Sequence, residues 1–234
     1  MSSKRLVIAS LVTLPIWTLS AQQERQPKEL SVVDPNRLTL MNVTAMRVQY
    51  RGREAIRLVN RPGSDGAAEA IAIVQGSEFR DGTIEADITG VPGAAADTSA
   101  RGFVGIAFHV DSAGDRFAAF YLRPTNGRAT DQLRRNHATQ YVVAPDYPWH
   151  RLRREQPGVY ESYVDLEPGV WTSVRIDVRD GKAQLFVNGS KQPVLVVNDM
   201  KNPPGSGRIA LWIGAGTEAH FSRLRVTPSR GQIR

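Results

Sequence analysis

Short strand-like segments separated by tight-turn sequences recur along most of the chain, and this pattern limits the possible folds more than any other feature. The runs RGR (51–53), DG (180–181) and NG (188–189) are turn sequences, because glycine, asparagine and aspartate tolerate positive φ. No segment shows a sustained helical period with capping residues. About ten short strands at this spacing predict an all-β fold, a two-sheet antiparallel sandwich of the jelly-roll type.

Alternation of apolar and polar residues orients the individual strands. Ile84, Ala86 and Ile88 share one face of their strand, while Glu85 and Asp87 share the other. The strand over 102–110 is almost free of charge on both faces, which predicts a central position in a sheet. The expected strands cover 45–50, 55–59, 70–74, 78–88, 102–110, 116–123, 160–166, 172–178, 183–188, 193–197, 208–213 and 220–226.

Residues 1–21 have the layout of an export signal. Lys4 and Arg5 precede an apolar stretch, and Ala21 offers a small residue for cleavage. The apolar stretch is short for a membrane span, which takes about 20 residues. We therefore expect an exported protein, periplasmic or secreted, with no membrane contact after cleavage. A signal retained as a membrane anchor is the alternative.

The rest of the chain is long enough for one domain with a substantial core. Residues 22–36 are polar and interrupted by proline, which indicates a linker or N-terminal arm, and 37–230 should form a single β-sandwich domain. The 234 residues include no cysteine, so the fold cannot depend on disulfides. The sequence leaves the oligomeric state open.

The positive charge of the chain is dispersed. Arginine outnumbers lysine 25 to 5 and the net charge is +7, but the basic residues form no block and no nucleic-acid motif is present. Nucleic acid is therefore not an expected partner. Because the guanidinium group pairs well with carboxylate and phosphate, an anionic sugar is compatible with this composition.

The segment 116–154 gathers aromatic, guanidinium, amide and imidazole side chains outside any evident core. We interpret about 124–158 as an inserted loop, and long connections on a rigid scaffold are where binding chemistry tends to lie. Flat aromatic faces beside directed hydrogen-bonding groups suit a saccharide or glycan, although a surface loop held by its own aromatics and ion pairs has the same composition. The predicted ligand-binding residues are His109, Tyr121, Arg123, Asn126, Arg134, Arg135, Asn136, Gln140, Tyr141, Tyr147, Trp149 and Arg151.

Two details sharpen this prediction. Alternation places Tyr121 and Arg123 on one strand face, which we also assign to His109. Five arginines lie close together in the sequence and repel one another unless they are paired or face an acceptor, so at least Arg134 or Arg135 should face the ligand. On this basis Arg135→Gln is expected to weaken binding more than about tenfold. The five are Arg134, Arg135, Arg151, Arg153 and Arg154.

Several of these runs resemble one known superfamily. WTSVRIDVRDGKAQLFVNG (171–189) is similar to a hairpin of concanavalin A-like lectin/glucanase domains, the group that includes laminin G-like modules and family 16 glycoside hydrolases. FRDGTIEAD (79–87), GFVGIAFHV (102–110) and the pair of strands over 207–226 resemble further strands of that group. The resemblance covers about residues 70 to 227. It implies a jelly roll with a carbohydrate ligand, nearest to bacterial secreted family 16-like or 3-keto-disaccharide hydrolase domains, on a sheet face capped by 126–154.

Catalysis is less well supported than binding. The E-x-D-x-E motif of family 16 hydrolases is absent, and Glu85 with Asp87 is its nearest approximation, although solvent-facing strand residues have the same pattern. His137 lies beside an arginine and an asparagine that can tune its protonation. A hydrolase or lyase acting on plain or 3-keto glycosides is thus the alternative to a binding module, and an adhesion module without a small ligand is a second alternative. The candidate acid and base residues are His137, Asp131, Asp146, Glu85 and Asp87.

No metal or cofactor motif is present. The four histidines show no spacing typical of a zinc site, and no nucleotide-binding or nucleophile motif occurs. Calcium is the one alternative, because laminin G-like relatives often bind it at the sandwich rim and Asp111 to Asp115 could supply oxygen ligands. An ordinary Asp/Gly turn explains the same residues.

Overall fold

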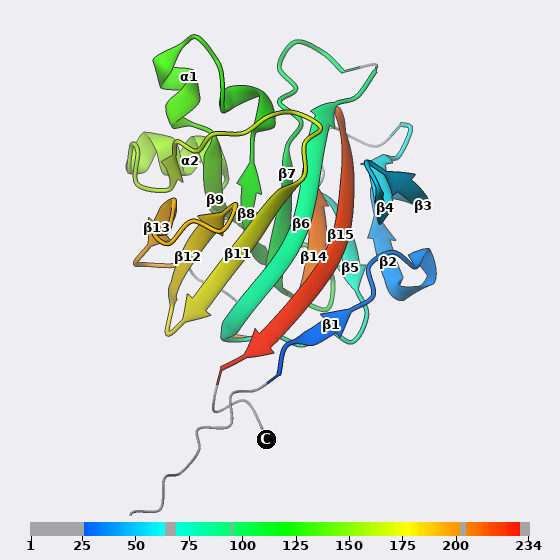
Figure 1. Cartoon of the computed structure of the whole chain (residues 1–234). Coiled ribbons are helices and arrows are strands. Elements are labelled where there is room, and N and C mark those ends of the chain that lie inside the picture. The colour runs from blue at the N-terminus through cyan, green and yellow to red at the C-terminus, as the bar shows by residue number, and fades with distance from the viewer. Residues whose placement is uncertain (1–25, 64–68, 95, 202–204, 230–234) are drawn as a thin grey trace, which may run out of the picture.

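The computed structural model describes residues 26–63, 69–94, 96–201 and 205–229, so the predicted export signal lies outside the described residues. Within these ranges the strands form two antiparallel sheets packed face to face (Figure 1), which confirms the predicted two-sheet jelly roll. One sheet has the order β13(Leu195–Val197), β12(Lys182–Val187), β11(Thr172–Arg179), β6(Gly82–Pro92), β15(Thr217–Pro228), β4(Arg53–Asn60), β3(Val43–Tyr50), with β1(Lys28–Leu30) paired to β15. The other has the order β10(Glu161–Ser162), β9(Thr139–Ala144), β8(Phe117–Leu122), β7(Val104–Val110), β14(Arg208–Ile213), β5(Ala70–Val74), β2(Leu38–Met41).

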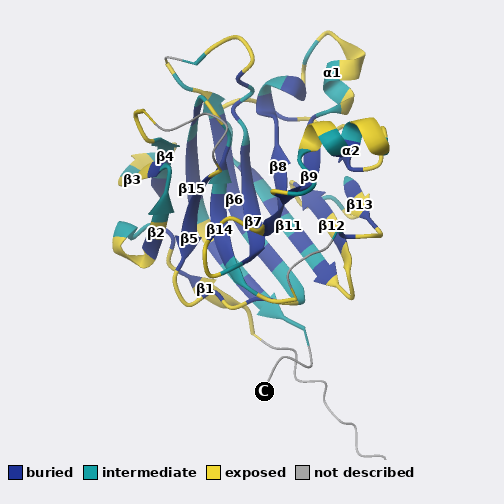
Figure 2. Ribbon diagram, turned by 180° about the vertical axis from the view of Figure 1, so that it is seen from behind, coloured by how far each residue is buried: buried dark blue, intermediate teal, exposed yellow. Residues whose placement is uncertain are grey.

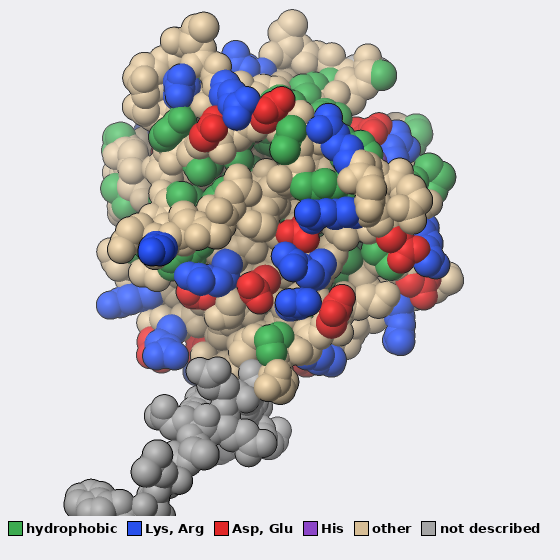
Figure 3. Space-filling view, in the orientation of Figure 1, with side chains coloured by type: hydrophobic (Ala, Val, Ile, Leu, Met, Phe, Trp, Pro, Cys, Tyr) green, Lys and Arg blue, Asp and Glu red, His purple; other side chains and the backbone are tan. Residues whose placement is uncertain are grey.

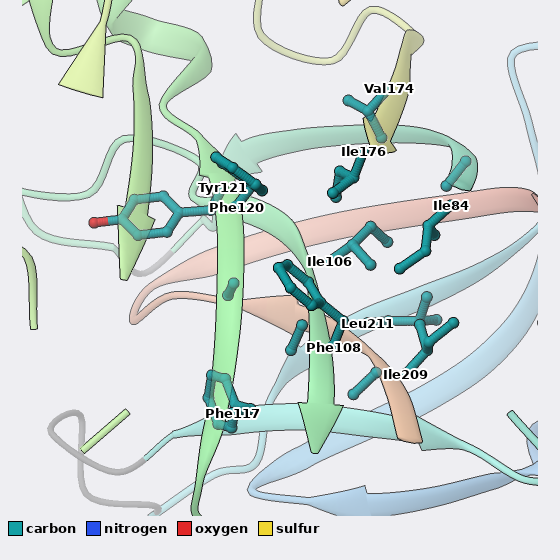
Figure 4. Packing of buried hydrophobic residues seen from close by; sticks show 14 of the residues in the cluster. Ile84, Ile106, Phe108, Phe117, Phe120, Tyr121, Val174, Ile176, Ile209 and Leu211 are labelled. Atoms are coloured by element: carbon teal, nitrogen blue, oxygen red, sulfur yellow. The ribbon is translucent and has the colours of Figure 1, made fainter. Parts of the chain in front are cut away.

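The core lies between the two sheets, and alternation decides which residues enter it. Ile84 and Ile88 of β6 are buried there, as predicted, and Ile88 lies beside Ile106 and Phe120 from the opposite sheet. Figure 4 shows Phe120 and Tyr121 on opposite sides of β8, with the ring of Phe120 toward the core. The buried colour of both sheets in Figure 2 extends along the whole sandwich. Burial of this apolar surface is the main source of stability in a chain without disulfides.

One row of residues crosses the outer face of the second sheet. Ile71, Trp212, Gly105, Tyr121, Gln140 and Glu161 are paired in register from β5 to β10. Directly paired residues point to the same face, and Tyr121 points away from the core, so the whole row lies outside. The strands therefore carry polar and aromatic side chains across this face toward β10.

The predicted insertion is more regular than a loop. It contains η2(Pro124–Asn126), α1(Gln132–Asn136), the complete strand β9 and α2(Trp149–Glu155), and a further 3-10 helix, η1(Pro35–Arg37), precedes β2. The helices are five and seven residues long, too short to show a helical period in the sequence. Asp131 caps α1 by accepting a hydrogen bond from the Arg134 amide at 2.7 Å.

Two other differences concern the predicted arm and His109. Part of the arm forms β1, which pairs with the end of β15. His109 has a φ of 55° beside an irregularity in the pairing of β7 with β14, which breaks the alternation of the strand. No helix in the described part of the chain is long and apolar enough to cross a membrane.

Candidate functional site

A pocket of about 770 Å³ lies where the segment before β7, the end of β8 and the two short helices meet. Figures 1 and 2 both show α1 and α2 at this end of the sandwich. We call it the insertion pocket. Its lining residues are Ser99, Arg101, Phe103, Arg123, Asn126, Asp131, Leu133, Arg134, His137, Trp149 and Arg153.

Arg123 is the most buried charged residue of the lining, with 5% of its surface exposed. Its guanidinium donates to the His137 carbonyl at 2.9 Å, to the Tyr121 hydroxyl at 3.0 Å and to Gln140 Oε1 at 3.0 Å. The amide of Gln140 donates in turn to the carbonyls of Tyr141 and Tyr160 at 2.9 and 3.0 Å. These acceptors are all neutral, so within the described part of the chain the charge of Arg123 has no carboxylate partner.

An aromatic stack supports Arg123 from below. The guanidinium lies 5.0 Å from the centre of the Tyr121 ring, and that ring stacks on Trp212 at 4.6 Å. Gly105 lies between them in the row, and a Cβ there would meet the Phe120 carbonyl at 2.2 Å and Tyr121 Cβ at 2.6 Å. β7 and β8 can therefore approach one another this closely only with glycine at position 105. Burial raises the pKa of the Tyr121 hydroxyl.

Arg134 is positioned by neutral groups as well. Its Nε donates to Asn126 Oδ1 at 2.9 Å and its terminal nitrogen to Thr125 Oγ1 at 3.2 Å. Asn126 is buried and donates to the His137 carbonyl at 3.0 Å, the carbonyl that also accepts from Arg123. The turn after β8 thus joins both arginines in one hydrogen-bond network.

Arg101 and Phe103 complete the other wall. The Arg101 guanidinium donates only to the nearby carbonyls of Thr98 and Ala100, at 2.6 and 2.9 Å. Partial burial, followed by the positive charges of Arg134 and Arg123, lowers the pKa of Arg101. The side chain of Phe103 is 6.1 Å from Tyr121, ring centre to ring centre, and lends the pocket an apolar surface.

Trp149 and Arg153 of α2 line the opposite wall. Trp149 is 44% exposed, and the Arg153 guanidinium lies 4.9 Å from its ring centre. Arg153 also binds Glu161 of β10 through two nitrogens, with distances of 3.0 and 2.6 Å. Arg153 thus differs from the other lining arginines, because it is paired with a carboxylate. That carboxylate is buried, with 4% of the Glu161 side chain exposed.

Glu161 also contacts His137, whose Nε2 lies 3.2 Å from its Oε1. Burial is the main cause that lowers the pKa of His137; Glu161 raises it, and the positive charges of Arg153 and Arg123 lower it further. The lowered pKa favours the neutral ring, and a neutral imidazole can accept a proton or donate its own N–H.

The structure brings together only part of the predicted site. Tyr121, Arg123, Asn126, Arg134, Gln140 and Trp149 lie in or directly behind the pocket, together with the candidate acid and base residues His137 and Asp131. Arg135 instead donates to the Tyr163 hydroxyl at 3.0 Å, and Asn136 accepts from Gln132 within α1. Arg151 stacks over Tyr147 and pairs with Glu155, while Asp146 pairs with Arg116.

Two predicted ligand contacts are core residues. Tyr141 is fully buried against Phe120 and Tyr160, because its position in β9 faces the inside of the sandwich. The ring of His109 stacks on Phe79, and its Nε2 contacts the Arg80 carbonyl at 2.6 Å, because the irregular β7 backbone turns it away from the row of Tyr121. Neither side chain lines the insertion pocket.

Glu85 and Asp87 lie on the outer face of the other sheet. Asp87 pairs with Arg53 at 2.8 Å and with Arg223 at 3.0 Å. Glu85 is in register with Arg175 and Arg225. The two sheets separate these carboxylates from the insertion pocket, so they cannot act on the same ligand as His137.

The turn considered for calcium does not fit a cation. Burial alone would raise the pKa of Asp111, but backbone N–H groups of Gly114, Arg116 and Asp115 outweigh it and lower the pKa. One oxygen of Asp111 accepts from these three amides at 2.7 to 3.4 Å, so the turn presents donors around it. Among the described residues no three His, Asp or Glu side chains are grouped as metal ligands.

Sequence reasoning missed several lining residues, and one signal was available. Arg101 and Phe103 precede β7, and the antiparallel pairing of Val104 with Leu122 places them beside the turn after β8. The hairpin around 111–115 implies that register. No sequence feature indicated that Glu161 lies beside the pocket, because the pairing of β10 with β9 depends on the path of the chain through α2.

The sequence matches no family model and no curated protein, but many solved structures share the fold. The carbohydrate-binding module CBM66 from Bacillus subtilis aligns with a TM-score of 0.55 and 13% identity, over 80% of this chain and 93% of that one. A Bacillus subtilis protein of unknown function with a galectin-like fold gives a TM-score of 0.53 and 12% identity, over 86% and 98%. The VIP36 exoplasmic/lumenal domain, in a Ca²⁺/Man3GlcNAc-bound form, gives 0.54 and 11%, over 89% and 93%.

These likenesses establish the fold and no more, since a jelly roll hosts many functions. The protein has a jelly-roll fold like that of these solved structures, as its strand motifs predict.

Proposed function

We propose that the protein binds a saccharide in the insertion pocket. The observation that carries this proposal is the composition of the pocket walls. Phe103 and Trp149 offer apolar ring faces, and Arg101, Arg123 and Arg134 of the same lining offer directed N–H groups. A sugar ring has apolar C–H faces and a rim of hydroxyl groups, so it needs both kinds of surface at once.

The size and position of the pocket support the proposal. Its volume of about 770 Å³ is in the range of ordinary small-ligand sites. It lies where the insertion covers one end of the outer row, so part of a ligand can be enclosed while a longer chain extends to solvent. Two of the similar structures are a carbohydrate-binding module and a lumenal domain bound to Man3GlcNAc. Saccharide recognition outside the cytoplasm also agrees with the predicted export signal.

The direct test combines a glycan array with calorimetry on the best ligand. Trp149→Ala is expected to weaken binding about tenfold or more, because it removes an aromatic face from the ligand. The same change should leave the free energy of unfolding nearly unaltered, because 44% of the Trp149 surface is already exposed.

Val196→Ala is the matched control. Val196 is an exposed apolar residue on β13 of the other sheet and does not line the insertion pocket. The Val196→Ala variant should bind the saccharide with the affinity of the wild type. Unchanged affinity in Trp149→Ala, or equal losses in both variants, would show that the saccharide is held elsewhere.

A second candidate function is acid/base processing of the same saccharide. The observation that favours it is the contact of the neutral His137 with the buried Glu161, at the back of the pocket. A histidine that can exchange a proton beside a carboxylate is a common arrangement for general acid or base catalysis. The salt bridge of Glu161 to Arg153 holds that carboxylate in place.

Turnover of plain and 3-keto glycosides decides between the two functions. If the protein is a hydrolase or lyase, His137→Ala should abolish turnover while calorimetric binding persists. Binding without turnover of any such substrate by the wild type would leave saccharide recognition as the function. Retained turnover in His137→Ala would exclude this residue as the essential acid or base.

A further inference from the structure

Four arginines line the insertion pocket, but only one of them has a carboxylate partner. Arg153 is paired with Glu161. Arg101, Arg123 and Arg134 donate only to carbonyl, hydroxyl and amide oxygens, and no described carboxylate lies within ion-pair distance of their guanidinium groups. The pocket therefore has a surplus of positive charge that its own residues do not neutralise.

The acidic residues near the pocket are already in use. Asp131 caps α1 through the Arg134 amide, and Glu161 is bound by Arg153 and His137. Asp97 lies near Arg101 and accepts hydrogen bonds from the Ser99 amide and hydroxyl at 2.7 and 2.5 Å. Among the described residues, none of these three carboxylates lies within ion-pair distance of Arg101, Arg123 or Arg134. Burial, followed by the positive charges of Arg134 and Arg123, lowers the pKa of Arg101, while the negative charge of Asp97 raises it.

Such an arrangement is costly unless an anion completes it. Like charges that share a partly buried site repel one another, and removal of a guanidinium from water has its own cost. Arg123 is held in position on the Tyr121 ring and Arg134 on Asn126, so these groups are oriented in advance rather than free to turn to solvent. The guanidinium fork matches the two oxygens of a carboxylate, or those of a sulfate ester.

We propose that the insertion pocket selects a negatively charged saccharide, whose carboxylate or sulfate group is bound by Arg101 together with Arg134 and Arg123. Phe103 and Trp149 then contact the sugar ring that carries this group. The inference rests on the proposed saccharide binding and adds the chemical class of the ligand. A uronic acid at a chain end or within a polysaccharide has the required chemistry.

Arg101 is the residue of choice for the test, because its own contacts are confined to two neighbouring carbonyls. Calorimetry would compare a panel of uronate trisaccharides with the same trisaccharides after reduction of each carboxylate to a primary alcohol. The two members of each pair have the same ring and linkage and differ only in charge. A sulfated trisaccharide and a single-stranded oligonucleotide complete the set of probes.

The wild type is expected to bind at least one uronate trisaccharide about tenfold or more tightly than its reduced partner. Arg101→Gln should remove most of that difference, so that the variant binds the uronate trisaccharide and its reduced partner with similar affinities. Arg101→Lys should retain more uronate affinity than Arg101→Gln. Arg154→Gln is the matched control, because Arg154 is an exposed arginine of α2 that does not line the pocket, and it should behave as the wild type.

The outcomes separate the two proposals. Equal affinity for uronate and reduced trisaccharides, with both lost in Trp149→Ala, would overturn the acidic preference and leave saccharide binding intact. No binding of any saccharide would overturn both proposals. Tight binding of the sulfated probe that depends on Arg101 would support recognition of the anionic group in general. Equally tight, Arg101-dependent binding of the oligonucleotide would contradict the inference, because the site would then bind any polyanion.

Discussion

Arginine side chains have different partners on the two outer faces of the sandwich. On the eight-stranded sheet, arginines pair with carboxylates of the same face, and Figure 3 shows positive and negative side chains interspersed on this face. Asp87 alone joins Arg53 and Arg223. In the insertion pocket, Arg101, Arg123 and Arg134 are held by neutral oxygens instead, and Arg153 is paired with Glu161. The other pairs of the eight-stranded sheet are Arg47 with Glu54, Arg57 with Glu218, Arg175 with Asp177, and Arg225 with Glu29.

This difference shows why arginine content alone is a poor guide to function. A paired arginine at the surface contributes little stability and satisfies its own charge, so it needs no ligand. An arginine fixed by neutral groups keeps its full attraction for an anion. What marks the pocket is therefore that Arg101, Arg123 and Arg134 have no carboxylate within ion-pair distance among the described residues, and that property appears only when the strands are assembled.

The largest expected effect comes from removing the most buried pocket arginine. Arg123→Ala should lower the free energy of unfolding by about 3 kcal/mol, because buried acceptors on Tyr121, Gln140 and the His137 carbonyl lose their donor. Urea denaturation measures this loss in the free energy of unfolding. On the other face, Arg223→Ala should cost less than about 1 kcal/mol, since its side chain is 42% exposed. Similar costs for the two variants would remove the contrast between the faces.

A smaller effect should follow from pH. The pKa of His137 in the pocket and that of His220 on β15 are both lowered, in each case mainly by burial. Below the ordinary histidine pKa of about 6.5 the unfolded chain takes up protons that the folded chain does not, so the free energy of unfolding falls as the pH falls from about 7 to 5. Urea midpoints across that range give the slope.

His137→Gln should reduce this slope, and the remaining pH dependence should include the contribution of His220. A slope that stays unchanged in His137→Gln would mean that His137 has the same pKa in the folded and unfolded chain. A slope of the opposite sign in the wild type would contradict the directions of both shifts.

The smallest expected effect concerns Arg135. The sequence predicts a loss of more than about tenfold in affinity for Arg135→Gln, but the structure directs this side chain to Tyr163, away from the pocket lining. We now expect a change of less than about twofold in saccharide affinity, measured by calorimetry. A tenfold loss would place the ligand over α1 and Tyr163 and would move the site.

The fold could be predicted from the sequence because strand alternation and turn residues are local properties. The RGR turn is a clear case, since Arg51 and Gly52 both have positive φ and join β3 to β4 with Tyr50 paired to Arg53. The buried face of Ile84, Ala86 and Ile88 follows from period two alone.

The site could be predicted only in part, because it depends on contacts between distant segments. Alternation correctly separates Tyr121 from Phe120, and the insertion does supply Asn126, Arg134 and Trp149 to the pocket. Alternation fails at His109, where the strand is irregular. For Tyr141 it could not be applied, because the short helices on each side hid the strand β9 within the insertion.

One NMR titration tests the location of the site most directly, because the two faces each carry a tryptophan indole. Trp149 lines the insertion pocket, while Trp171 lies by the eight-stranded sheet, where its Nε1 donates to the Tyr50 carbonyl at 3.3 Å. The titration would add the saccharide that binds best to ¹⁵N-labelled protein, with the signals assigned through Trp→Phe variants. Our account predicts that the Trp149 indole signal shifts with ligand concentration while the Trp171 signal stays in place. A shift of Trp171 with no change at Trp149 would place the saccharide on the other face and contradict the account.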